Sequence, residues 1–221
     1  MTRTTTSTSV IDVAPKPRTD RIRAAGAACT LGGLALAAGA IATQIVQIVQ
    51  TSTSVSDQLW RYPWGSRTAV INWAVWGSMQ ALVLIGVLAW RRSGGAGSGR
   101  AARVGLPLAT LGTALIIVGH FASIPIRNQT VHDTGAQLVG GIFAVGTMLS
   151  ALGLLLAGWA TLYAGVWRDW QRFVPLAIGV VTVALIGLQF TKALPTGVAV
   201  YSLGFAVLGV ALIQHRRTAR P

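Results

Sequence analysis

Three ionisable side chains lie close together in a stretch that separates two long apolar segments. They are His120, His132 and Asp133, within residues 119–141. A histidine relays protons near neutral pH, and a histidine with a carboxylate is a common general acid–base pair. Two histidines and one carboxylate are also ligands that zinc accepts. The spacing of these residues matches no recognised zinc-ligand pattern, so we assign no metal to them.

His120 is the most informative of the three because it falls inside an apolar segment, near its end. We interpret it as a neutral histidine that hydrogen-bonds a neighbouring helix, with a proton relay or a substrate contact as the alternative. Asp133 comes just before the next apolar segment, where the helix dipole stabilises a carboxylate. It competes there with Thr134, which has the spacing of a capping box with Gln137.

A wider set of polar residues is expected on the same side of the protein. Amide and ionisable groups next to apolar segments tend to face the bundle interior or water, since lipid offers them no hydrogen bonds. The set defines a candidate polar vestibule formed by Gln44, Gln47, Asp57, His120, Arg127, His132, Asp133 and Gln137. No catalytic, metal-binding or cofactor-binding residue is assigned, because the sequence has no phosphate-binding glycine loop and no HExxH, GxSxG or CxxC motif.

The composition indicates that lipid is the solvent for most of the chain. Of its 221 residues, 52% are hydrophobic and 10% are charged, whereas soluble domains have about 25% charged residues. The mean hydropathy is +0.60. The net charge of +13 arises from short basic clusters between apolar runs, which is typical of cytoplasmic membrane loops and not of a nucleic-acid-binding surface. The single cysteine, Cys29, excludes an internal disulfide.

Six apolar segments are predicted to be transmembrane helices, since each is long enough to cross about 30 Å of hydrocarbon. They lie at residues 24–49, 68–90, 104–124, 135–165, 173–190 and 197–214. We therefore expect an all-α, six-span domain over residues 24–214, a disordered basic tail at 1–23 and a short basic tail at 215–221. Small residues recur at every fourth position in two spans and predict close helix packing; they are Ala25, Cys29, Gly33 and Ala37, and Gly105, Ala109 and Thr113. A cleavable signal peptide is the alternative for the first span, but its apolar run is long for one.

The basic residues predict the orientation of the helices. Fourteen of the 18 Lys and Arg residues fall on the side of the N-terminus, and cytoplasmic loops retain positive charge. Both termini are therefore expected in the cytoplasm. The first loop on the outer side contains Trp60, Tyr62 and Trp64, which we interpret as membrane-surface anchors, with stacking on a ligand as the alternative.

Two short stretches carry a resemblance to known membrane proteins. SDQLWRYPW and VHDTGAQLVGG resemble segments of uncharacterised six-helix membrane proteins of actinobacteria, and the layout is more distantly similar to membrane proteins of the DRAM and Frag type. The resemblance implies a multi-pass protein of a bacterial plasma membrane. It assigns a role to no residue.

Three classes of function remain open. A non-enzymatic membrane protein of structural, sensory or accessory type is favoured. A small transporter is the second class, although broken helices or an inverted repeat at the membrane midplane would be expected for it. An enzyme acting on lipid is the third, and it requires His120, His132 and Asp133 to converge. The expected partners are the lipid bilayer and either another membrane protein or a second copy of this chain, with no nucleic acid and no cofactor.

Overall fold

The computed structural model describes residues 18–49, 55–189 and 191–214, and every regular element in them is helical. The elements are α1 (Arg18–Val49), α2 (Ser66–Ser93), α3 (Arg100–Ala122), α4 (Thr134–Ala164), the 3-10 helix η1 (Asp169–Phe173), α5 (Val174–Leu188) and α6 (Leu194–Gln214). Six of them are long and apolar enough to cross a membrane. The predicted all-α, six-span fold is confirmed.

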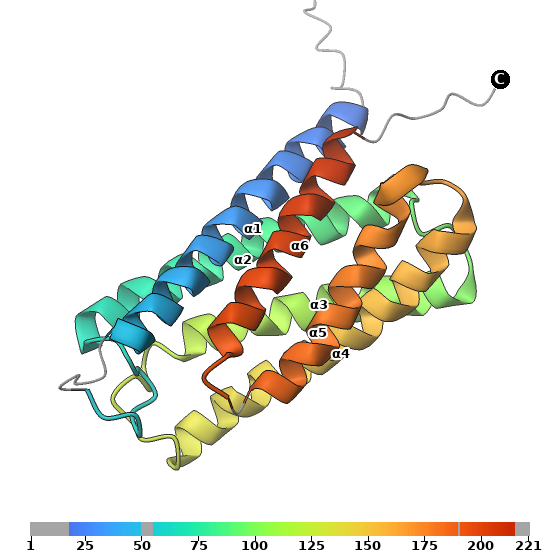
Figure 1. Ribbon diagram of the computed structural model, residues 1–221. Coiled ribbons are helices and arrows are strands. Elements are labelled where there is room, and N and C mark those ends of the chain that lie inside the picture. The colour runs from blue at the N-terminus through green and yellow to red at the C-terminus, as the bar shows by residue number, and fades with distance from the viewer. Residues whose placement is uncertain (1–17, 50–54, 190, 215–221) are drawn as a thin grey trace, which may run out of the picture.

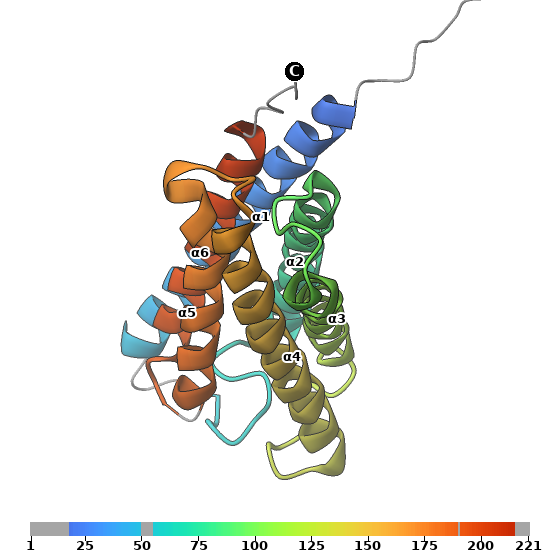
Figure 2. The same ribbon diagram turned by 90° about the vertical axis from the view of Figure 1, so that its right-hand side faces the viewer.

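The six long helices form a ring. Each packs against the next one along the chain, and α6 closes the ring against α1 (Figures 1 and 2). The loops 55–65 and 123–133 lie together with residues 189 and 191–193 at one end, which we call the hairpin end. Helix α1 begins and α6 ends at the opposite end, which we call the terminal end.

The helix boundaries differ from the predicted spans mainly at the start of α1. The helix begins at Arg18, six residues before the predicted first span, because a helix does not stop where hydrocarbon does. In this extension Arg21 and Arg23 are exposed while Ile22 is buried. The rest of the predicted basic tails, residues 1–17 and 215–221, lies outside the described residues.

Small residues bring two helix pairs into close contact, as the sequence predicts. In the α1–α6 pair, a Cβ on Gly33 would lie 2.5 Å from the Ala206 nitrogen. In the α3–α4 pair, a Cβ on Gly105 would lie 2.6 Å from the Ala157 nitrogen. Only glycine allows backbones to approach this closely. In lipid, the hydrophobic effect does not drive helices together, so close packing of this kind stabilises their association.

The terminal half of the ring is filled by apolar side chains. Trp90 and Trp167 are fully buried, with ring centroids 6.5 Å apart. Nearby, the Cys29 thiol donates a hydrogen bond of 3.3 Å to the Phe205 carbonyl oxygen. Trp170, three residues after Trp167, is exposed. We call this region the packed half.

Candidate functional site

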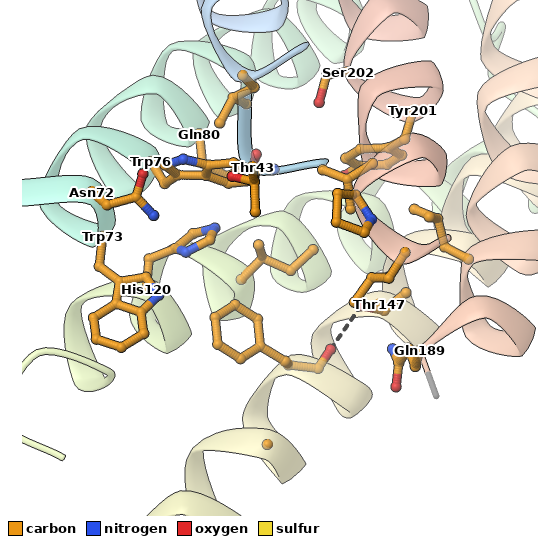
Figure 3. A pocket seen from close by; sticks show the side chains of 18 of the residues that line it. Thr43, Asn72, Trp73, Trp76, Gln80, His120, Thr147, Gln189, Tyr201 and Ser202 are labelled. Atoms are coloured by element: carbon orange, nitrogen blue, oxygen red, sulfur yellow. Dashed lines mark hydrogen bonds between the residues drawn. The ribbon is translucent and has the colours of Figure 1, made fainter. Parts of the chain in front are cut away.

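A cavity of about 430 Å³ occupies the hairpin half of the ring (Figure 3). All six long helices contribute to it, and so does the loop between α1 and α2. Its walls are mainly aromatic and aliphatic, and the polar side chains among them are Thr43, Gln47, Asn72, Gln80, His120, Thr147, Gln189 and Ser202. The cavity is partly open, and its volume is within the range of about 300–1,000 Å³ that is usual for small-molecule sites.

Two loops at the hairpin end are fixed to each other beside the cavity mouth. The backbone N–H of Trp60 donates to the Gln129 carbonyl oxygen at 3.0 Å, and the backbone N–H of Val131 donates to the Gln58 carbonyl oxygen at 2.8 Å. The Arg61 guanidinium adds a side-chain bond of 2.9 Å to the Asn128 amide oxygen. This pairing holds the first loop in place.

The same loop supplies three aromatic residues to the cavity. Trp60, Tyr62 and Trp64 all line it. The sequence interpretation favoured membrane anchors, with ligand stacking as the alternative. The structure places the three rings where a ligand would meet them.

His120 lies inside the bundle between two aromatic rings. Its ring centroid is 5.7 Å from that of Trp76 on α2 and 5.1 Å from that of Phe143 on α4. The side chain is 9% exposed, and its Nδ1 atom is buried without a hydrogen-bond partner. The sequence predicts a hydrogen bond from this histidine to a neighbouring helix, whereas the structure shows ring contacts with Trp76 and Phe143 and an unpartnered Nδ1 atom.

The deepest polar groups of the cavity come from α2 and α6. Gln80, close to the middle of α2, is 2% exposed, and Ser202 on α6 is fully buried. The Gln80 Nε2 and Ser202 Oγ atoms have neither a hydrogen-bond partner nor contact with solvent. The Gln80 amide lies beside the Tyr201 hydroxyl, but that hydroxyl has no partner with hydrogen-bond geometry. We call Gln80, Tyr201 and Ser202 the cavity floor.

Only two residues of the predicted vestibule, Gln47 and His120, line this cavity. Gln44 accepts a hydrogen bond of 3.1 Å from the Thr196 hydroxyl and so links α1 to α6. Arg127 donates to the Ser66 hydroxyl and the Ile124 carbonyl oxygen, both at 3.0 Å. Asp57 is exposed in the first loop. Gln44 and Arg127 thus hold local structure at the hairpin end.

His132 and Asp133 are exposed, whereas His120 is buried, and the structure assembles no site from the three. The Asp133 carboxylate accepts a hydrogen bond of 2.7 Å from the Thr130 N–H. Asp133 also holds the N-cap position of α4, so the predicted capping box starting at Thr134 is wrong. Gln137 donates to the His132 carbonyl oxygen at 3.1 Å instead. Within the described ranges, no three His, Cys, Asp or Glu residues are grouped as they would be around a metal ion.

The sequence interpretation left several cavity residues out of the site. Asn72, Trp76 and Gln80 recur at every fourth position on α2 and all line the cavity. A polar residue within a transmembrane segment is itself a signal for a functional site. This repeat was therefore a usable signal, whereas nothing in the sequence marks Ser202 as different from other helix serines.

The cavity suits an uncharged ligand. None of the described residues that line it is Asp, Glu, Lys or Arg, and an ion without a countercharge is costly to remove from water. No protein-family profile matches this chain, and no curated protein or solved structure is similar to it. The chemistry of the site is therefore argued from its own geometry.

Proposed function

We propose that this protein is a non-enzymatic, multi-pass membrane protein that binds a neutral, amphipathic small molecule, in a sensory or accessory role. One observation carries the proposal, namely the cavity at the hairpin end with aromatic walls and a buried polar floor. A concave, mainly apolar pocket with a few polar groups is the usual form of a small-molecule site. The separation of His120 from exposed His132 and Asp133 weighs against the lipid-acting enzyme, which needs all three together.

We infer that the cavity mouth faces the outer side of the membrane. This part of the proposal rests on the basic residues, which are concentrated at the terminal end, and on the retention of positive charge in the cytoplasm. The membrane is the plasma membrane of a bacterium, in keeping with the resemblance of two stretches to actinobacterial proteins. The ligand then enters from the outer medium or the outer leaflet.

A small transporter is the second candidate, favoured by the depth of the cavity floor. Gln80 lies near the middle of α2, and transporters bind their substrates near the membrane midplane. Release of a bound probe on both sides of proteoliposomes would support transport. Release on the hairpin side alone supports a binding protein, because the packed half then stays closed.

A matched pair of glycine substitutions tests whether the cavity binds ligands. Gly140 lines the cavity, and a Cβ there would meet only the Trp60 ring, at 3.8 Å. The neighbouring Gly141 is exposed, and a Cβ there meets nothing within 4 Å. The Gly140→Phe change should therefore fill the cavity, and Gly141→Phe should leave it open.

The measurement uses N-phenylnaphthylamine, a neutral amphipathic fluorophore, with the protein in nanodiscs. Energy transfer from the cavity tryptophans to the probe should saturate for the unchanged protein and for Gly141→Phe. It should fall to the unsaturable background of lipid partitioning for Gly140→Phe. Equal, saturable transfer in both variants would contradict the proposed binding site.

A further inference from the structure

The chemistry of the cavity narrows the class of ligand, on the condition that the proposed binding function holds. We propose that the cavity takes a neutral, planar ring with carbonyl acceptors and an apolar tail, which is the chemistry of an isoprenoid quinone. Three independent features of the cavity support this class of ligand: the charge of the lining, the unused hydrogen-bond donors, and the shape of the aromatic walls.

The first part is charge. The lining among the described residues has no acidic side chain to neutralise a cationic ligand and no Lys or Arg to neutralise an anionic one. The aromatic faces could attract a quaternary ammonium ion. The basic groups at the hairpin end oppose this: Arg61 and Arg127 are both fixed there by hydrogen bonds. A neutral head group needs no countercharge in the cavity, and Arg61 and Arg127 do not repel it.

The second part is the set of unused hydrogen-bond donors. The indole N–H of Trp60, the amide Nε2 of Gln80 and the hydroxyl of Ser202 are buried with no acceptor. An indole N–H only donates, and a hydroxyl group always carries a proton to donate. The Gln47 Oε1 atom is an unpartnered acceptor, but the same amide offers an NH₂ group when it turns. The buried Tyr201 hydroxyl is a further donor without a partner, and the unpartnered His120 Nδ1 atom donates or accepts according to the tautomer of the ring. Donors therefore outnumber acceptors among the unpartnered groups that line the cavity, and a ligand with acceptors suits them.

These donors lie at two levels of the cavity. Trp60 is in the loop at the mouth, and Gln80 and Ser202 are at the floor. They are sealed within the wall in the ligand-free protein, since none of the three atoms contacts solvent. A small rotation of the Gln80 amide or of the Ser202 hydroxyl presents them to an occupant. A carbonyl oxygen of the ring is the acceptor that the donors at either level lack.

The third part is the shape of the walls. Trp76, His120 and Phe143 form a continuous run of rings across α2, α3 and α4, as the two ring contacts of His120 show. Flat, electron-poor rings pack well against the electron-rich faces of indoles. A volume of about 430 Å³ is small for a binding site, so it accommodates a ring and the start of a tail. The remainder of a long tail lies in the surrounding lipid.

The test measures quenching of tryptophan fluorescence by a decyl-substituted benzoquinone in nanodiscs. Quenching should saturate with the quinone-to-lipid ratio, after subtraction of the quenching seen in Gly140→Phe. The Gln80→Leu change should weaken this binding about tenfold, the effect of one lost hydrogen bond. Ser150→Ala is the matched control. Its hydroxyl is also buried and unpartnered, but it lies on α4 outside the cavity, and quinone binding should be unchanged.

Three results would overturn the assignment. Decylbenzene, with the same tail and no carbonyl group, would bind as tightly as the quinone; tetramethylammonium would displace the quinone; or Gln80→Leu would bind it unchanged. In each case, saturable binding of N-phenylnaphthylamine that is lost in Gly140→Phe would still support the proposed binding function. Failure of the quinone assignment is thus distinguishable from failure of the proposed binding function, and retained probe binding by Gln80→Leu shows that this variant is folded.

Discussion

Replacing Gln80 by leucine should stabilise the ligand-free protein while it weakens ligand binding. The Gln80 Nε2 atom is buried, lacks a hydrogen-bond partner and has no contact with solvent, so neither protein nor water offsets its desolvation. A buried donor without a partner costs about 1–3 kcal/mol. Leucine is one atom shorter but fills a similar volume, and it offers an apolar surface to the side chains around it. We therefore expect the free energy of unfolding to rise by about 1–3 kcal/mol.

The size of the shift follows from the length of the chain. For domains of 150–250 residues, 1 kcal/mol corresponds to about 2–4 °C in the melting temperature. The expected rise for Gln80→Leu is therefore roughly 2–12 °C. Thermal unfolding of the purified protein in detergent, followed by tryptophan fluorescence, measures it. Ser78→Ala is the control, since its exposed hydroxyl bonds only to the Ala74 carbonyl oxygen one turn earlier, and its melting temperature should scarcely change.

A fall in the melting temperature of Gln80→Leu would refute this reasoning. It would mean that the amide already has a partner in the folded protein, and the neighbouring Tyr201 hydroxyl is the group within reach. The Tyr201→Phe change and the double variant identify that case. Loss of one shared hydrogen bond makes the two single effects non-additive, whereas two unpartnered groups give additive effects.

Two further predictions concern topology and helix packing. With Cys29 replaced by alanine, a cysteine at the exposed Ser98 position should react with a membrane-impermeant maleimide only from the cytoplasm, and one at the exposed His132 position only from outside; labelling of both from one face would exclude the six-span topology. A Cβ on Gly86 would overlap the Cys29 side chain, so Gly86→Ala should cost about 1–3 kcal/mol. The double change Gly86→Ala with Cys29→Gly should recover part of that loss in a thermal unfolding assay, and strictly additive losses would show that the two side chains do not meet.

The helices and their close contacts could be predicted because both depend on local patterns. A long apolar run identifies a spanning helix whatever surrounds it. A small residue at every fourth position, as in Gly105, Ala109 and Thr113, places a smooth stripe on one helix face. Both patterns can be read directly from the amino-acid sequence. The start of α1 was missed because the segment Arg18–Arg23 is mostly polar. A polar segment outside the hydrocarbon can continue a helix or end it, and hydropathy does not distinguish the two.

The cavity could not be predicted in the same way, because it depends on how six helices diverge at one end. The sequence interpretation searched for ionisable residues near span ends, and most of these bond to close neighbours: Asp133 to Thr130, and Arg127 to Ile124. The polar floor lies deeper, in the middle of α2 and on α6. Ser202 resembles the other helix serines until the packing shows that its hydroxyl has no partner.

The contrast between the packed half and the cavity has an electrical consequence. Water that fills the cavity extends the aqueous boundary at the hairpin end inward, towards the middle of α2 where Gln80 lies. The transmembrane voltage then falls mainly across the layer that contains Trp90, Trp167 and Phe205. A unit charge at the cavity floor has then crossed little of that voltage, whereas a unit charge carried through the packed half changes energy by about 2.3 kcal/mol per 100 mV. A neutral occupant carries no net charge on which the membrane potential acts, so its binding stays constant while that potential varies.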